Sequence, residues 1–374
     1  MPPKKLPTIW NAPPHTIAKI EMLRAYLVAW FQILGRTRRG QELLYVDGFA
    51  GPGEYSNYTT GSPLAALSAA KEALELTGAD WIAGKIHCAF IEADTDRCSH
   101  LRQKIESIEN GSNIETHWYC EEFTEGLRQL MMDVPRPFTA RHPLFVFIDP
   151  FGATGVPFSV VRQLLASPCS EVLINLDADG IARIFHAGER AAHAQNLNDI
   201  FDGDEWRSLL DANDPPAIFY QKVLQLYKTK LRSIPNVRYV FAFEMRTTEY
   251  ALNYYLVFAS QYYLGLEKMK EAMRKIDQTG GYCFSDARVG QNLLFRFDDP
   301  HQHSPDLYDH FRGKKATYEE LRDFALNESP FPNPKRLLRD LEVKRELIEG
   351  VESTDPRRRK GTFNEDKLIY VKFK

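Results

Sequence analysis

The chain has 374 residues, 44% hydrophobic and 26% charged, which suits two or three globular domains. The net charge of −3 excludes a protein that binds nucleic acid by bulk charge alone. Residues 314–374 carry 15 Lys and Arg against 12 Asp and Glu, which permits a basic surface there. No apolar run reaches the ~20 residues of a membrane span, and the N-terminus lacks the apolar segment of a signal peptide.

The five cysteines favour a reduced protein in the cytoplasm. Their number is odd, no Cys-x-x-Cys pair occurs, and three of them lie in or beside apolar, strand-like runs. We therefore expect free thiols, without disulfide or zinc, at Cys88, Cys98, Cys120, Cys169 and Cys283.

Short apolar runs alternate with helical segments along the first half of the chain. A helix at residues 16–34, with apolar side chains every three or four positions, comes before this pattern. The predicted strands are 43–49, 86–91, 114–120, 144–148 and 172–176, and the predicted helices are 63–76, 95–108, 122–132 and 157–166. This alternation predicts an α/β fold, a parallel sheet covered by helices on both faces.

The second half predicts a hairpin and a separate module. Residues 178–215 are polar and form an insertion near the carboxyl edge of the sheet, before a helix at 216–231. Strands at 237–245 and 251–260 are joined by a short turn, so they pair antiparallel. Helices at 317–326 and 333–347, a basic turn and a strand at 368–373 resemble a winged-helix module. The domains expected are 1–42, 43–300 and 314–374.

The first motif, DGFAGPG at residues 47–53, directly follows a predicted strand. Small residues at this point let the backbone approach a ligand closely. The lysine and hydroxyl residue of a P-loop are absent, which disfavours a nucleoside triphosphatase. The alternative is a tight turn capped by the aspartate. The candidate cofactor-binding residues are Asp47, Gly48, Phe49, Ala50, Gly51 and Gly53.

Acidic residues end the second and third predicted strands. Glu92 is placed to accept the ribose hydroxyls of a nucleoside cofactor, although a surface carboxylate is the alternative. Glu121 is a candidate for the adenine amino group, and an acidic first helical turn explains it equally well. Asp94 fits a helix cap.

The fourth strand ends in Asp149, Pro150 and Phe151. The carboxyl ends of parallel strands line the site in an open sheet. Asp149 or a backbone carbonyl is expected to accept hydrogen bonds from an exocyclic amine while Phe151 stacks on its ring. The alternative is a proline turn with a buried phenylalanine. Residues 175–179 (NLDAD) are expected to close the same pocket.

Several other features favour ordinary structural roles. Asp177 and Asp179 are not expected to bind a metal, and His301 with His303 is typical of a solvated loop. We predict no metal site. Residues 357–360 (RRRK) fit either a phosphate-binding wing or a solvated hairpin. The paired tyrosines at 254–255 and 262–263 are expected in the core.

With these motifs in place, the chain resembles the three-Cys-motif partner (TcmP) family. The resemblance spans the N-terminal helix, VDGFAGPG (46–53), GSP (61–63), IDPFG (148–152) and the winged-helix-like tail. It implies a bacterial or archaeal protein like a class I methyltransferase, with S-adenosylmethionine (SAM) as cofactor and a three-cysteine-motif protein as partner. Residues 149–152 (DPFG) are also similar to the fourth motif of tRNA guanine-N2 dimethyltransferases.

These resemblances imply a SAM-dependent methyltransferase that acts on an exocyclic amine of a nucleic-acid base in tRNA or DNA. Methyl transfer is an in-line displacement, so positioning by Asp149, Pro150 and Phe151 supplies much of the catalysis. A non-catalytic SAM- or nucleic-acid-binding partner subunit is one alternative. A dinucleotide-dependent oxidoreductase is another, which the antiparallel last strand disfavours.

Overall fold

The computed structural model describes residues 7–150, 155–187, 191–247, 251–291 and 298–374. Its main body is an eight-stranded sheet in the order β3-β2-β1-β4-β5-β7-β6-β8. Neighbouring strands are parallel, except that β7 is antiparallel to β5 and β6. The strands are β1 (Leu43–Asp47), β2 (Ile86–Ile91), β3 (Ile114–Tyr119), β4 (Leu144–Ile148), β5 (Ser170–Leu176), β6 (Tyr239–Arg246), β7 (Leu252–Ser260) and β8 (Cys283–Ser285).

Both faces of the sheet are buried because helices cover each of them, and successive side chains of a strand point to opposite faces. Leu44 and Val46 of β1 pack into one core, and Leu43 and Tyr45 pack into the other. The first core is covered by α4 (Phe123–Asp133), α6 (Phe158–Ala166), α7 (Ala178–His186), α8 (Ala191–Phe201) and α10 (Pro216–Arg232). The second is covered by α1 (Pro14–Thr37), α2 (Ser62–Thr77), α3 (Thr95–Glu106) and α11 (Tyr263–Ile276).

The predicted fold class is confirmed. Five parallel strands precede a hairpin whose second strand, β7, inserts antiparallel between β5 and β6. This is the strand order of the class I methyltransferase sheet. Short helical turns lie at Gly78–Asp80, Arg136–Thr139, Trp206–Leu209 and Asp286–Arg288. No helix among the described residues has both the length and the apolarity that crossing a membrane requires.

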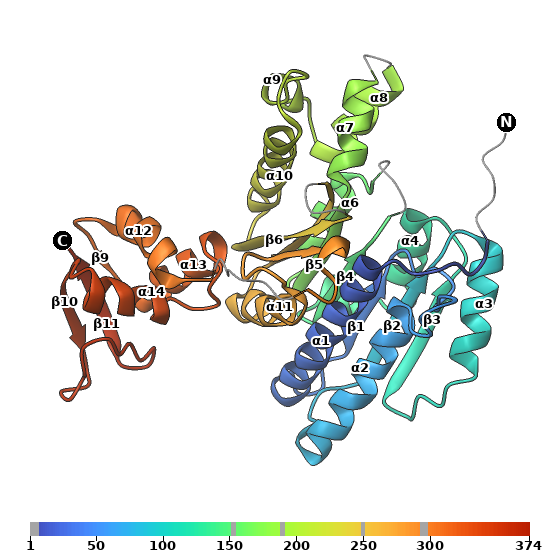
Figure 1. Ribbon diagram of the computed structural model, residues 1–374. Coiled ribbons are helices and arrows are strands. Elements are labelled where there is room, and N and C mark those ends of the chain that lie inside the picture. Colours follow the sequence, from blue (N-terminus) through green and yellow to red (C-terminus); the bar gives the residue numbers. More distant parts are fainter. Residues whose placement is uncertain (1–6, 151–154, 188–190, 248–250, 292–297) are drawn as a thin grey trace.

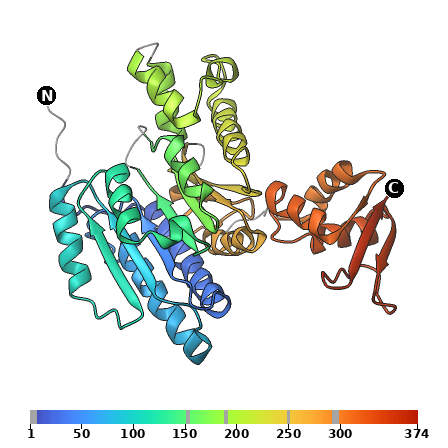
Figure 2. The ribbon, with the colours of Figure 1, turned by 180° about the vertical axis from the view of Figure 1, so that it is seen from behind.

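The insertion at 178–215 is helical, since α7, α8 and the turn at Trp206–Leu209 fill most of it. Figures 1 and 2 show α7 and α8 projecting from one edge of the sheet. No helix or strand is predicted from the sequence between residues 261 and 316, where the structure has α11, β8, α12 and β9. Three-residue and two-residue strands such as β8 and β9 are too short to show a periodic pattern.

A small C-terminal module stands to one side of the sheet, beyond α11 (Figures 1 and 2). Its three strands form an antiparallel sheet in the order β10-β11-β9, and its core includes Leu307, Leu321, Leu337 and Val371. The module consists of α12 (Pro300–Phe311), β9 (Lys315–Ala316), α13 (Tyr318–Glu328), α14 (Lys335–Arg339), a π-helical turn (Asp340–Lys344), β10 (Ile348–Ser353) and β11 (Leu368–Phe373).

A buried lysine of the sheet domain forms hydrogen bonds with backbone carbonyls of this module. Lys270 of α11 has no exposed surface, and its Nζ donates to the carbonyl oxygens of Ala325, Ser329 and Phe331 at 3.2, 2.6 and 3.3 Å. The Nζ also lies 4.0 Å from the ring centroid of Phe241. Ala325 lies in the last turn of α13 and Ser329 and Phe331 follow its end, so Lys270 supplies a donor to carbonyls at and beyond the end of this helix.

We expect Lys270→Met to destabilise the protein by roughly 2–4 kcal/mol, because it leaves buried carbonyl oxygens without a donor. Urea unfolding followed by circular dichroism measures the change. Lys268→Met on the same helix removes only a partly exposed pair with Glu271, so the midpoint should barely move. Equal midpoints for the two variants would contradict the fastening role of Lys270.

Candidate functional site

The loop after β1 is tied to the strands on either side of it. The backbone N–H of Gly48 donates to the carbonyl of Phe147 at 2.9 Å, and that of Ala50 donates to Ile91, also at 2.9 Å. Residues 48–50 therefore lie between the ends of β2 and β4, where the parallel sheet opens toward a ligand.

Gly51 is buried and has a φ of +62°, a conformation that favours glycine. A Cβ at this position would meet no atom within 4 Å, so the space on that side of the residue is open. Its N–H donates to Oε2 of Glu92 at 2.8 Å. Gly53 is fixed differently: its carbonyl accepts a hydrogen bond from Gly61, and a side chain on Gly61 would collide with it.

Asp47 is fully buried at the end of β1. Its Oδ1 accepts a hydrogen bond from the N–H of Phe49 at 3.4 Å, and its Oδ2 accepts one from the hydroxyl of Tyr45 at 3.4 Å. Burial raises the pKa of Asp47 to about 7, and a hydrogen bond from Ser62 opposes the rise. The buried carboxyl therefore has a strong preference for a cationic neighbour or a proton.

Glu92 is 7% exposed and orders the turn after β2. Its Oε2 accepts from Gly51, as described, and its Oε1 accepts from the N–H of Asp94 at 2.9 Å. Burial raises the pKa of Glu92. Asp94 caps α3 through the N–H groups of Asp96 and Arg97, as the sequence indicated.

A cavity of about 360 Å³ lies at this edge of the sheet, in the size range of small-molecule sites. Phe49 and Phe123 stack at its wall with ring centroids 5.4 Å apart. Of the candidate residues, Phe49, Glu92 and Pro150 line it. Glu121 is exposed and does not line the cavity, whereas its neighbour Glu122 does.

Asp149, at the end of β4, is held by two side chains. Lys19 Nζ lies 2.5 Å from its Oδ2, and Asn175 Nδ2 donates to its Oδ1 at 2.7 Å. Lys19 is 6% exposed and comes from α1, so the N-terminal helix contributes to the site. Phe151, the third candidate residue of this turn, lies outside the described residues.

Lys19 is not among the site residues predicted from the sequence, and Tyr254 is predicted only as a core residue. Lys19 Nζ lies 5.1 Å from the ring centroid of Tyr254. The available signal was the position of Lys19, four residues before Leu23 on the apolar side of the predicted helix. The Oδ1 of Asn175 and the hydroxyl of Tyr254 are buried and have no partner among the described residues.

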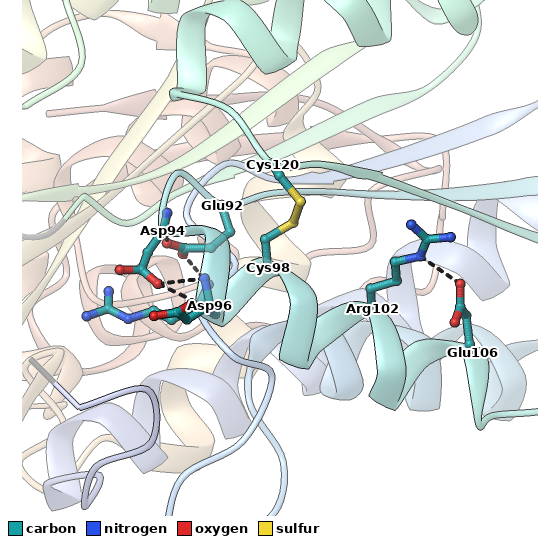
Figure 3. The surroundings of a disulfide bond; sticks show 9 residues. Glu92, Asp94, Asp96, Cys98, Arg102, Glu106 and Cys120 are labelled. Atoms are coloured by element: carbon teal, nitrogen blue, oxygen red, sulfur yellow. Dashed lines mark hydrogen bonds and ion pairs between the residues drawn. A yellow bond between two sulfur atoms is a disulfide. The ribbon is translucent and has the colours of Figure 1, made fainter.

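A disulfide joins Cys98 of α3 to Cys120, beside Glu92 and Asp94 (Figure 3). The expectation of five reduced thiols is therefore wrong for these two, while Cys88, Cys169 and Cys283 are free. The start of α3 packs against the end of β3, which brings the two Cα atoms to 5.6 Å. A separation of 22 residues carries no local signal for such a contact.

In the basic turn of the C-terminal module, residues 357–360, the side chain of Arg358 is paired within the module. Arg358 pairs with Glu342 at 2.6 Å and lies 4.8 Å from the ring centroid of Phe363. The Arg358 side chain therefore makes its contacts within the module. Arg357, Arg359 and Lys360 are exposed.

No protein-family model and no curated protein sequence matches the chain. Among solved structures it is similar to an O-methyltransferase from Bacillus cereus in complex with SAH, with 11% identity, coverage of 63% of this chain and 80% of the other, and a TM-score of 0.34. It is similar to TomG from Streptomyces achromogenes in complex with SAM, with 12% identity, coverage of 62% and 78%, and a TM-score of 0.31.

A third similar structure is SAH-bound PaMTH1 from Podospora anserina, with 12% identity, coverage of 67% and 89%, and a TM-score of 0.30. The TM-scores of all three structures are below 0.5. The fold assignment therefore depends on the strand order itself.

Burial of Asp47 predicts a specific dependence of stability on pH. Because its pKa rises from 3.8 to about 7 on folding, the folded state binds more protons across that window. The free energy of unfolding should fall as pH rises, by about 2–3 kcal/mol between pH 5 and 7 from this group. Urea unfolding at pH 5 and pH 8 should show a weaker fall for Asp47→Asn than for the parent. Exposed Asp80→Asn is the control, and equal pH dependence in all three proteins would refute the assignment.

Proposed function

We propose that the chain is a SAM-dependent methyltransferase. The observation that carries this proposal is Gly51, which is buried, has open space at its Cβ position and donates its N–H to Glu92 at the carboxyl edge of a class I sheet. Close backbone approach and an acidic residue on the neighbouring strand suit a nucleoside cofactor.

The charges around the cavity suit the cationic end of SAM. Asp47 is buried nearby, and Glu92, Asp94 and Glu122 line the cavity. Among the described lining residues, Arg97 is the one that is basic. We infer that Asp47 and residues 48–51 hold the amino-acid part, Glu92 the ribose, and Phe49 with Phe123 the adenine. Gly53 shapes the loop through Gly61. Bound SAM supplies a methyl group on a sulfonium, ready for in-line displacement.

Asp149 is the proposed acceptor-binding residue. Lys19 and Asn175 fix its carboxylate, so it can accept a hydrogen bond from an incoming amine without reorganisation. The Oδ1 of Asn175 has no partner among the described residues and supplies a second acceptor. A carboxylate and an amide oxygen supply the two acceptors that the two N–H bonds of an exocyclic amine need, which favours a base of tRNA or DNA. Pro150 and Phe151 would complete the pocket.

The C-terminal module is proposed to be winged-helix-like and to bind the nucleic-acid backbone. Helices followed by a three-stranded antiparallel sheet in the order β10-β11-β9 fit that arrangement. Exposed Arg357, Arg359 and Lys360 would contact phosphates. We place the start of this domain near residue 300, because α12 contributes Leu307 and Phe311 to its core.

A non-catalytic role as the partner subunit of a three-cysteine-motif protein is the second proposal. The resemblance to the TcmP family favours it, and it shares the SAM or nucleic-acid binding described above. The two proposals differ in the role of Asp149: the methyltransferase needs it for turnover, and the non-catalytic subunit does not.

Calorimetric titration with SAM tests the cofactor. We expect micromolar binding, weakened at least about tenfold by Gly51→Ala, whose methyl group enters the empty space. Gly40→Ala is the matched control, because Gly40 has a φ of +66° and open space around it but is exposed. Absence of SAM binding, or equal loss in both variants, would reject the assignment.

Transfer of labelled methyl from SAM to bulk tRNA or DNA tests the acceptor site. Asp149→Asn and Lys19→Met should each lower turnover by roughly 10²-fold or more while SAM binding stays intact. Lys85→Met is the control for loss of a partly exposed paired lysine. If no methyl is transferred by the parent with its partner present, the non-catalytic role is favoured.

A further inference from the structure

Two histidines and a glutamate lie close together on β2 and β3, away from the carboxyl ends of the strands that border the cofactor cavity. His87 is the second residue of β2, and Glu115 and His117 belong to β3. Asp47, by contrast, is the last residue of β1, and Glu92 directly follows the carboxyl end of β2. The three residues are therefore not part of the site described above.

The strand register brings the three side chains to one face. β2 and β3 are parallel, with His87 opposite Glu115 and Ala89 opposite His117. Residues two apart on a strand share a face, so Glu115 and His117 both lie on the side of His87. The contact is thus set by backbone pairing rather than by chance approach of mobile side chains.

The three donor atoms are close enough to share one ion. Nδ1 of His87 lies 3.0 Å from Nε2 of His117 and 3.4 Å from Oε2 of Glu115. All three lie within 4.8 Å of one another. Two ligands at about 2.0–2.1 Å from a tetrahedral zinc ion are roughly 3.3–3.4 Å apart, so only small movements are needed.

The surroundings fit a ligand set better than a closed hydrogen-bond network. Lys85 contacts Oε1 of Glu115, which leaves Oε2 facing the imidazoles. The ring centroids of His87 and His117 lie 5.3 Å apart. Nε2 of His87 is buried and has no partner among the described residues. The Glu115 side chain is 40% exposed, so water can reach a fourth coordination position.

We propose that His87, Glu115 and His117 form a binding site for a divalent transition metal of the zinc type. Two imidazoles and one carboxylate are ligands that this class of ion prefers, and imidazole binds in its neutral form. The ion would tie the edge strand β3 to β2 and stabilise that end of the sheet.

The test is a calorimetric titration of the tag-free, chelator-treated full chain with zinc chloride. We expect one ion per chain, and a rise in the melting temperature that follows saturation. His117→Gln and Glu115→Gln should each weaken binding at least about tenfold. His186→Gln, which removes an exposed histidine of α7, should leave the affinity unchanged.

Cobalt(II) gives a second reading, because coordination by the three residues changes its visible absorption. The parent should show a saturable spectrum that both ligand variants lose. No stoichiometric zinc binding by the parent, or binding that survives both substitutions, would overturn the proposal and leave the imidazoles as a simple hydrogen-bonded pair. SAM binding is measured separately, so failure here does not bear on the proposed transferase.

Discussion

The position of β1 between two parallel neighbours controls the whole candidate site. The loop that leaves β1 is hydrogen-bonded to the end of β4 through Gly48 and to the end of β2 through Ala50. Gly51 then reaches the carboxylate of Glu92, which in turn orders the start of α3. Because these bonds depend on the strand order, the empty space at Gly51 is fixed by the sheet rather than by flexible side chains.

The charged side chains at the carboxyl ends of the strands are the second constraint on the candidate site. Asp47 and Asp149 both lie at strand ends, and their proximity raises the pKa of Asp47 further after burial has done so. Lys19 reaches Asp149 from α1, so the N-terminal helix supplies a counter-ion for this carboxylate. The helix, which has 24 residues, therefore contributes to the site as well as to the core. Asp149 has this counter-ion, whereas no ion pair of Asp47 is found among the described residues.

Much of the sheet follows from the sequence, because continuous apolar runs predict buried parallel strands and a four-residue turn predicts the hairpin. The loop at 47–53 and Glu92 were located by their place after strands. Lys19 could not be located from the sequence, because a lysine on a helix is ordinarily a surface residue and its partner Asp149 is 130 positions away. Glu121 and Glu122 are adjacent, so only the helical turn at Phe123 decides which one lines the cavity. The disulfide between Cys98 and Cys120 and the cluster at His87 both depend on contacts between residues 22 or more positions apart, which no local pattern encodes.

The account predicts where a nucleoside cofactor lies, and a crystal structure of the chain grown with SAH tests that most directly. We expect its density in the cavity at the ends of β1, β2 and β4, with the ribose beside Glu92, the adenine against Phe49 and Phe123, and the amino-acid end over Gly51. Density elsewhere on the protein, or an empty cavity at saturating SAH, would contradict the proposed function.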